Sequence, residues 1–273
     1  MSIDFSDLFS IRGRVALVTG GSRGIGEMIA AGYLSAGAKV YISSRKAAVC
    51  EATAARLAET YGGECIAIPS DLSQVAGVER LAGEMAERER ALDILVNNAG
   101  AAWGAKLGEF PEMGWDKVMD TNAKGPFFLT QALLPLLEAA ASADRPARVI
   151  NIGSIDGIRT PAMDNLSYGP AKAAIHYMTR IFAAHLAGRH IRVNAIAPGP
   201  FPTWMLSTGV GFGGETEGVD WGAVGARNPS GRVGTAQDAA GLAIFLASKA
   251  SAYVTGQVIA FDGGIVVSGG AGI

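Results

Sequence analysis

The chain has 273 residues, of which 49% are hydrophobic and 18% charged, and its net charge at pH 7 is −2. This length allows a large core, and the charge balance argues against a nucleic-acid or anionic-membrane partner. The two cysteines, Cys50 and Cys65, have no metal or redox spacing, so we expect reduced thiols. The N-terminus lacks a signal-peptide pattern, and no stretch reaches the roughly 18 apolar residues of a membrane helix, so we expect a cytoplasmic protein.

Apolar runs typical of strands alternate with helical patterns along the chain. The predicted strands cover residues 14–20, 39–43, 64–68, 92–98, 147–153, 191–197 and 257–263. Helical patterns between them include residues 47–62, 78–91 and 127–142. Strands that are apolar throughout are typical of parallel sheets covered on both faces. We therefore predict one α/β domain over residues 1–273 with a Rossmann-like, doubly wound sheet, in which the irregular segment at about 200–229 is a flexible substrate lid.

The first predicted strand ends in a glycine-rich loop, "TGGSRGIG". Glycines that lead from a strand into a helix let the backbone approach a pyrophosphate, which the helix N-terminus attracts. The spacing G-x-x-x-G-x-G is unusual, but its position favours a dinucleotide site over a simple turn. The predicted contacts in this loop are Gly20, Ser22, Arg23, Gly24, Ile25 and Gly26.

The second predicted strand ends in "YISSRK". A fold that prefers NAD usually has an acidic residue here for the ribose 2′-hydroxyl. Ser44 occupies that place, Arg45 follows it, and Arg23 lies on the same side of the site. Arginine binds phosphate through a planar fork of donors, so these residues favour NADPH/NADP+ over NADH. The alternative is that they are solvated surface charges.

The third and fourth predicted strands lead to "PSDL" and "NNAG". Asp71, followed by Leu72, can accept a hydrogen bond from an adenine amino group. The segment with Asn98, Ala99 and Gly100 can hold backbone against the adenosine half of a dinucleotide. Both segments are equally consistent with turn caps.

The fifth predicted strand ends at Ser154, and Tyr168 and Lys172 follow, one helical turn apart. A tyrosine normally titrates near ~10, and a cation about 4 Å away contributes ~4 kcal/mol at an effective dielectric constant of about 20. We therefore predict that Lys172 lowers the pKa of Tyr168, which acts as the general acid of a carbonyl reduction. We expect Ser154, at a neighbouring strand end, to hydrogen-bond the substrate oxygen. The alternative, a core tyrosine beside a surface lysine, is disfavoured because the glycine loop and Ser154 converge on the same cleft.

Gly169 and Pro170 lie between this tyrosine and lysine, although both are poor residues for a helix interior. With Ser167 as N-cap, Pro170 falls in the first turn, where N–H groups have no intrahelical partner. The free N–H groups of Tyr168 and Gly169 then add positive potential beside the phenol. The alternative is a helix that begins near Asn165 and is distorted at Pro170.

Taken together, these motifs resemble those of the short-chain dehydrogenase/reductase family over nearly the whole chain. They include "VALVTGGSRGIG", "DILVNNAG", "VINIGS", "YGPAK", "RVNAIAPG" and "YVTGQVIAFDGG". The resemblance implies a seven-stranded sheet of order 3-2-1-4-5-6-7 and a catalytic tetrad in which Asn122, beside Ser154, Tyr168 and Lys172, orders a water. The cofactor contacts that it implies are Asn98 and Gly100 near the adenosine ribose, Lys172 at the nicotinamide ribose, the Pro-Gly pair at Pro198 and Gly199, and Thr203 at the nicotinamide amide or phosphates.

Within the family the chain is most similar to NADPH-dependent β-ketoacyl reductases, in particular the rhamnolipid type, through "GGSRGIGEMIA", "YGPAKAA" and "NAIAPGPFP". We therefore expect an oxidoreductase that acts on CH–OH groups and reduces a ketone, including that of a 3-oxoacyl thioester, to a secondary alcohol. Pro170 and the glycine-rich segment 205–227 depart from the family pattern. A dehydrogenase of a sugar, polyol or other secondary alcohol, and a non-catalytic dinucleotide sensor, remain alternatives.

Three further patterns concern metal binding, self-association and the opening of the predicted site. The histidines His176, His185 and His190 share no metal-ligand spacing, so we predict no metal and ordinary helix residues. Segments 122–140 and 168–186 are apolar on more than one face, which favours a homo-oligomer, a dimer or a tetramer. Large apolar residues near the predicted opening fit a lid over the substrate or ordinary packing equally well; they are Phe201, Trp204, Met205, Phe212 and Trp221.

Overall fold

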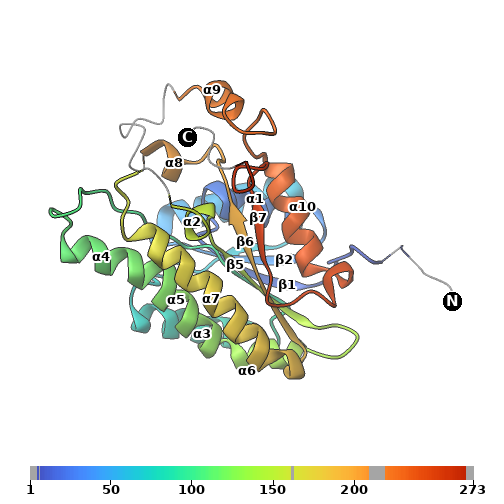
Figure 1. Cartoon of the computed structure of the whole chain (residues 1–273). Coiled ribbons are helices and arrows are strands. Elements are labelled where there is room, and N and C mark those ends of the chain that lie inside the picture. The colour runs from blue at the N-terminus through green and yellow to red at the C-terminus, as the bar shows by residue number, and fades with distance from the viewer. Residues whose placement is uncertain (1–4, 6, 161–162, 209–218, 269–273) are drawn as a thin grey trace.

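The computed structural model describes residues 5, 7–160, 163–208 and 219–268. Its centre is a parallel sheet of seven strands in the order β3-β2-β1-β4-β5-β6-β7 (Figure 1). This order confirms the prediction from sequence. The strands are β1 (Val15–Thr19), β2 (Lys39–Ser43), β3 (Cys65–Ala67), β4 (Ile94–Asn97), β5 (Ala147–Ile152), β6 (Ile191–Pro198) and β7 (Val258–Phe261).

Helices cover both faces of the sheet (Figure 1). The longer ones are α1 (Gly24–Ser35), α2 (Ala47–Tyr61), α3 (Val75–Arg88), α4 (Glu112–Met119), α5 (Gly125–Ala132), α6 (Leu134–Ala140), α7 (Tyr168–Leu186) and α10 (Ala236–Ala247). The shorter helical segments are α8 (Trp204–Thr208), α9 (Trp221–Ala226), the π-helical turn η1 (Asp120–Lys124) and the 3₁₀ turns η2 (Ile155–Gly157), η3 (Ala187–Arg189) and η4 (Lys249–Ser251). Helices α1, α2 and α10 pack on one face, and α3, α5, α6 and α7 on the other.

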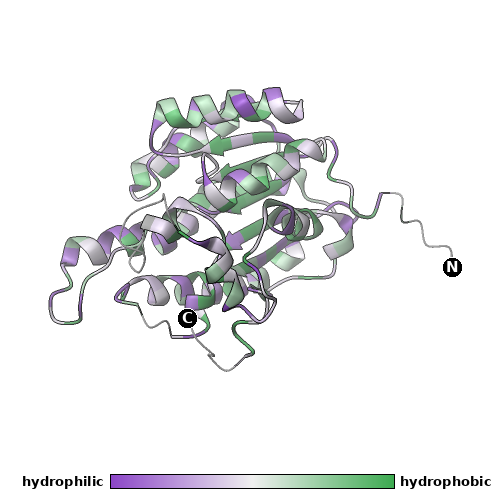
Figure 2. Cartoon of the chain, turned by 90° about the horizontal axis from the view of Figure 1, so that it is seen from above, coloured by the Kyte–Doolittle hydropathy of each residue, from purple (hydrophilic) through white to green (hydrophobic). Residues whose placement is uncertain are grey.

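The alternation of side chains along each strand creates these two cores. In β1, Ala16 and Val18 point toward α1 and α10, whereas Leu17 points toward α3 and α5, and all three are fully buried. Figure 2 shows largely hydrophobic strands between helices along which hydrophobic and polar residues are mixed. Because all the strands are parallel, their carboxyl ends lie along one edge, where the connecting loops form a site.

Two predicted helices differ in detail from the structure. The predicted helix 78–91 begins earlier, at Val75, and ends at Arg88. The predicted helix 127–142 is two helices, α5 and α6, that meet at Leu133. Pro135 explains the break, because a proline has no N–H group for the helical hydrogen-bond ladder.

Helix α7 begins at Tyr168, with Ser167 as the flanking residue, so the alternative start near Asn165 is wrong. The Ser167 side chain makes no capping hydrogen bond, and the N–H group of Tyr168 donates to the carbonyl of Asn165 at 2.8 Å. The expectation of a free Tyr168 N–H group is therefore also wrong. Pro170 occupies the third position of the helix, where it removes no intrahelical bond.

The segment predicted as a lid is described in part. Helix α8 and helix α9 belong to it, whereas residues 209–218, with Phe212, lie outside the described residues. Within the described part of the chain, no helix is both long and apolar enough to cross a membrane.

Candidate active site

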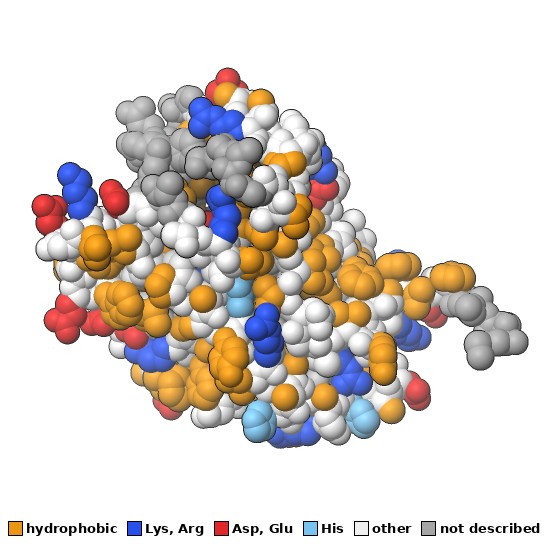
Figure 3. Space-filling model, in the orientation of Figure 1, with side chains coloured by type: hydrophobic (Ala, Val, Ile, Leu, Met, Phe, Trp, Pro, Cys, Tyr) orange, Lys and Arg blue, Asp and Glu red, His pale blue; other side chains and the backbone are white. Residues whose placement is uncertain are grey.

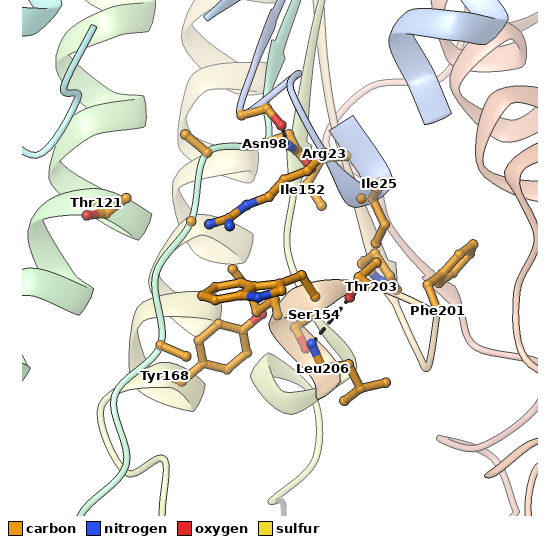
Figure 4. Close-up of a pocket in the computed structure, with 18 of the residues that line it drawn as sticks. Arg23, Ile25, Asn98, Thr121, Ile152, Ser154, Tyr168, Phe201, Thr203 and Leu206 are labelled. Atoms are coloured by element: carbon orange, nitrogen blue, oxygen red, sulfur yellow. Dashed lines mark hydrogen bonds between the residues drawn. The ribbon is translucent and has the colours of Figure 1, made fainter. Parts of the chain in front are cut away.

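A cavity of about 650 Å³ opens at the carboxyl ends of the strands, between the N-terminus of α1, the turn after β5, and α8. Figure 4 shows Arg23 and Tyr168 reaching into it from opposite sides. Of the residues predicted from sequence, all except Gly26 and Asn122 line this cavity. The sequence motifs, which are spread over most of the chain, thus converge on one site.

The glycine loop shapes the end of the cavity near β1. Gly20 and Gly24 have φ angles of +64° and +58°, a backbone conformation that favours glycine. Gly26 packs below the loop, since an added Cβ would lie 2.4 Å from the carbonyl oxygen of Gly20. Arg23 precedes the helix and provides no side-chain cap, so the first N–H groups of α1 remain for an anion.

Two guanidinium groups lie close together at this end of the cavity. Burial, and after it the charge of Arg45, lowers the pKa of Arg23. The buried hydroxyl of Ser43, beside Ser44 in the cavity wall, has no hydrogen-bond partner among the described residues. Paired cations and an unsatisfied hydroxyl fit a phosphate group, so these residues fit a dinucleotide that carries a 2′-phosphate.

The segments after β3 and β4 have structural roles as well as places in the cavity wall. The Asp71 carboxylate accepts hydrogen bonds from the N–H and hydroxyl groups of Ser73 at 3.1 and 2.8 Å, as the alternative of a turn cap predicted. The Asn98 amide donates to the carbonyls of Thr19 and Gly20 at 2.8 and 3.2 Å. Asn98 therefore joins the end of β4 to the glycine loop.

Ser154, Tyr168 and Lys172 come together beyond the end of β5. The Ser154 Oγ accepts a hydrogen bond from the N–H group of Asp156 at 3.1 Å, and Figure 4 shows Ser154 next to Tyr168. The Lys172 Nζ donates to the carbonyl of Ile152 at 2.8 Å and lies 5.5 Å from the centroid of the Tyr168 ring. This arrangement places a hydroxyl, a phenol and an ammonium group around one point.

The pKa values of this group depend mainly on burial. Burial, followed by the charge of Asp156, raises the pKa of Tyr168 above its usual value, and a side-chain hydrogen bond with Ser154 opposes this in part. Burial lowers the pKa of Lys172 to about 8. The prediction that Lys172 lowers the pKa of Tyr168 is therefore wrong here, because burial and the charge of Asp156 both raise it. The phenol is protonated at neutral pH, which is the form that a general acid requires.

Asn122 lies behind the cavity wall, in the π-helical turn η1. Its amide donates to the carbonyl of Ala101 at 2.7 Å and accepts from the N–H group of the same residue at 3.0 Å. An added Cβ on Gly100 would lie 2.9 Å from its oxygen. Asn122 thus holds the loop after β4 against η1, and π-helical turns of this kind are frequent at functional sites.

The sequence analysis did not identify a polar wall on the substrate side of the cavity. Asp156, Arg159 and Asn165 line it, and the Arg159 Nε is buried without a hydrogen-bond partner among the described residues. Asp156 and Arg159 lie two and five residues after Ser154. This closeness to a predicted catalytic residue is the signal in the sequence that could have identified them. His176, treated there as an ordinary helix residue, accepts a hydrogen bond from the N–H group of Ser154 at 3.4 Å.

Helix α8 and the segment before it close the opposite wall. Phe201 is buried against Phe261, with ring centroids 5.6 Å apart, whereas Trp204 is half-exposed and lies 4.2 Å below the Arg23 guanidinium. Met205 also faces the cavity. Phe201 thus has a packing role, whereas Trp204 lines the cavity beside Arg23. The described residues include no cluster of three or more His, Cys, Asp or Glu side chains placed to hold a metal.

The site combines a dinucleotide-type glycine loop with a Ser–Tyr–Lys group at the carboxyl ends of the strands of a doubly wound sheet. This combination defines the chain as an oxidoreductase that uses a dinucleotide cofactor. A family model described as enoyl-(acyl carrier protein) reductase matches residues 20–266. The chain belongs to the short-chain dehydrogenase/reductase family.

Individual relatives differ in substrate. The chain is 51% identical, over 94% of its length and 97% of the relative's, to a rhamnolipids biosynthesis 3-oxoacyl-[acyl-carrier-protein] reductase of Pseudomonas aeruginosa. It is 37% identical, over 94% and 96%, to a 2-dehydro-3-deoxy-D-gluconate 5-dehydrogenase of Bacillus subtilis. A solved Pseudomonas aeruginosa RhlG/NADP active-site complex superposes with a TM-score of 0.89 at 50% identity, covering 96% of this chain and 100% of that one.

Proposed function

We propose that this chain reduces the ketone of a 3-oxoacyl thioester to a secondary alcohol, with NADPH as the hydride donor. The observation that carries the proposal is a single cavity that holds Ser154, Tyr168 and Lys172 together with Arg23 and Arg45. The 3-oxoacyl reductase at 51% identity supports the substrate class, and the NADP complex at 50% identity supports the cofactor.

In this proposal each group has one task. The reduced nicotinamide, when bound, supplies the hydride. Tyr168 holds the proton that the new alkoxide takes up, and burial keeps its phenol protonated at neutral pH. Ser154 binds the substrate oxygen, and Lys172, fixed on the Ile152 carbonyl, is held where it can bind the nicotinamide ribose. Asn122 completes the proposed tetrad.

The proposed cofactor site follows the cavity wall from β1 to α8. The N-terminus of α1 holds the pyrophosphate, and Arg23, Ser44 and Arg45 hold the 2′-phosphate. The remaining proposed contacts are Gly20, Ser22, Gly24, Ile25, Gly26, Asp71, Leu72, Asn98, Ala99, Gly100, Tyr168, Lys172, Pro198, Gly199 and Thr203.

The first test is turnover. Purified protein should deplete NADPH absorbance in the presence of an acetoacetyl thioester. Tyr168→Phe should abolish turnover without loss of NADPH binding, because the ring remains and only the proton donor is removed. Tyr253→Phe, a change on a fully exposed side chain, is the matched control. Turnover retained by Tyr168→Phe contradicts the assignment of the general acid.

A second candidate is a sugar-acid or polyol dehydrogenase. The polar wall of Asp156, Arg159 and Asn165 favours it, because buried donors and acceptors bind a hydroxyl-rich substrate. The gluconate-type relative at 37% identity also supports it. A panel of acetoacetyl thioesters, diketones and sugars with both cofactors separates the two candidates. Tight NADPH binding without turnover on the panel would favour a non-catalytic sensor.

The same proposal includes a homo-oligomer of single-domain subunits over residues 1–273. Large apolar side chains are exposed on α5 and α7, among them Phe127, Tyr177 and Ile181. Figure 3 shows hydrophobic side chains gathered over this side of the molecule. Such a face supports burial against a second copy. The segment at about 200–229, of which α8 forms a cavity wall, is the proposed substrate lid.

A further inference from the structure

His176 is a buried imidazole directly below the catalytic group. Tyr168, Lys172 and His176 follow each other at four-residue intervals, so they lie on one face of α7. Their face packs against the turn η2, which carries the residues after Ser154. The exposed fraction of His176 is 6%, close to the 4% of Lys172.

The imidazole holds the backbone of Ser154. The N–H group of Ser154 donates to the Nε2 of His176 at 3.4 Å, while the Oγ of the same serine accepts from the N–H group of Asp156 at 3.1 Å. The backbone of Gly157 makes a further hydrogen bond with the imidazole. Ser154 is thus held at two atoms, one toward α7 and one toward η2.

The adjoining glycines leave room for this ring. A Cβ at Gly153 would lie 2.0 Å from the His176 Nε2, and a Cβ at Gly157 would lie 2.8 Å from its Cε1. Real Cβ atoms do not approach other atoms so closely. The chain can therefore pack against the imidazole in this way only if positions 153 and 157 are glycine. The fit indicates that the ring and the turn form one unit.

The protonation state of the ring agrees with an acceptor role. Burial, and then the charge of Lys172, lowers the pKa of His176 to about 4, and Arg180 acts in the same direction. The Gly157 hydrogen bond opposes them. Both charged groups belong to α7. At neutral pH the imidazole is uncharged, and an uncharged ring has one nitrogen that can accept.

We propose that His176 is a positioning residue of the reaction: it accepts the Ser154 N–H group and thereby fixes the direction in which the Ser154 hydroxyl meets the substrate oxygen. The inference rests on the proposed reductase function. A misplacement of about 1 Å in a catalytic group costs on the order of 100-fold in rate. The loss should fall on kcat, because the cofactor and most of the substrate contact other parts of the cavity.

Two variants test the role, His176→Leu, which removes the acceptor at similar volume, and His176→Gln, which keeps one. We expect His176→Leu to lower kcat by about 10- to 100-fold with KM and the Kd for NADPH nearly unchanged. His176→Gln should recover most of the activity. His185→Leu, on the exposed side of the same helix, is the control. Equal losses in both His176 variants, or a loss confined to KM, would overturn the proposal.

A double-mutant cycle asks whether His176 acts through Ser154. In a Ser154→Ala background the hydroxyl is absent, so His176→Leu should cause no further loss of kcat. Losses that multiply would show that the imidazole acts elsewhere. The cycle uses whichever ketone of the substrate panel is turned over, so it does not depend on the thioester.

A measurement on the wild-type protein separates this inference from the proposed function. Nitrogen-15 NMR of the histidine side chains at pH 7 should show the Nε2 of His176 unprotonated and hydrogen-bonded. A protonated Nε2 would refute the inference even if the reductase assignment holds. The expected spectrum without turnover of any panel substrate would instead count against the reductase assignment alone.

Discussion

Lys172 is a charged group that the fold keeps almost out of water. The residue is 4% exposed, and its ammonium group donates to the backbone carbonyl of Ile152. Burial of a cation costs free energy unless it is well paired. The site therefore holds an ammonium group at the expense of the stability of the cofactor-free protein.

This cost depends on pH. The pKa of Lys172 is about 8 in the folded chain against an ordinary value of 10.5. Between these values the unfolded chain binds the proton and the folded chain does not, so stability rises with pH across this window and is lost as pH falls to about 8. The full difference corresponds to ~3 kcal/mol as an upper limit. Urea unfolding from pH 7.5 to 10.5 should show this rise in the wild type and its absence in Lys172→Met; parallel curves would contradict it.

A second prediction at this scale concerns Arg45. Arg45→Asp should weaken NADPH binding by about 10- to 100-fold, because a hydrogen bond to a charged group contributes ~1.5–3 kcal/mol. NADH binding should change little, since NADH has no 2′-phosphate. Arg90→Asp makes the same charge change at an exposed site outside the cavity. Titration of both cofactors by protein fluorescence measures the effect, and equal weakening of the two refutes the 2′-phosphate assignment.

At the scale of elements, the site depends on how helices begin. Helix α1 begins at a glycine with a positive φ and without a side-chain cap, and helix α7 begins with Tyr168, the proposed general acid, in the first position. In each case the first turn, where N–H groups are free or bonded outside the helix, faces the cavity. Helix termini therefore place the reactive and binding groups.

Gly24→Ala tests this at α1. An L-residue at a φ of +58° is strained, and its Cβ would lie 3.2 Å from the Thr203 side chain. We expect a loss of ~1–2 kcal/mol in the free energy of unfolding and a weaker affinity for NADPH. Gly188→Ala, where an added Cβ meets nothing within 4 Å, is the control. If the two variants unfold and bind alike, the conformation of Gly24 has no such importance.

The positions of the strands and of several cavity residues could be predicted from sequence. Apolar runs located the seven strands to within a few residues, and the glycine loop and the Ser–Tyr–Lys spacing located two parts of the cavity wall. The break at Pro135 was missed because the apolar pattern continues through it. The pKa of Tyr168 and the role of His176 could not be predicted, since each depends on how closely η2 packs on α7.

At the scale of the whole molecule, the exposed apolar face of α5 and α7 predicts self-association. Ile181→Glu should shift the protein toward smaller species, because the charge would be buried between subunits without a partner. Analytical ultracentrifugation measures the change. Val75→Glu, which changes another partly exposed apolar residue on α3, should leave the assembly intact. A wild-type protein that sediments as a monomer at micromolar concentration contradicts the prediction.

The contact between α1 and α10 joins two helices that lie far apart in the sequence. The Tyr33 hydroxyl donates to the carbonyl of Ala243 at 3.2 Å, and a Cβ at Gly32 would lie 2.4 Å from that of Ala240. The helix that begins at the glycine loop is thus covered by a helix that the ribosome makes much later. During synthesis one apolar side of α1 stays uncovered until residues 236–247 emerge. The helix that follows the glycine loop therefore receives its full packing only after α10 has been made.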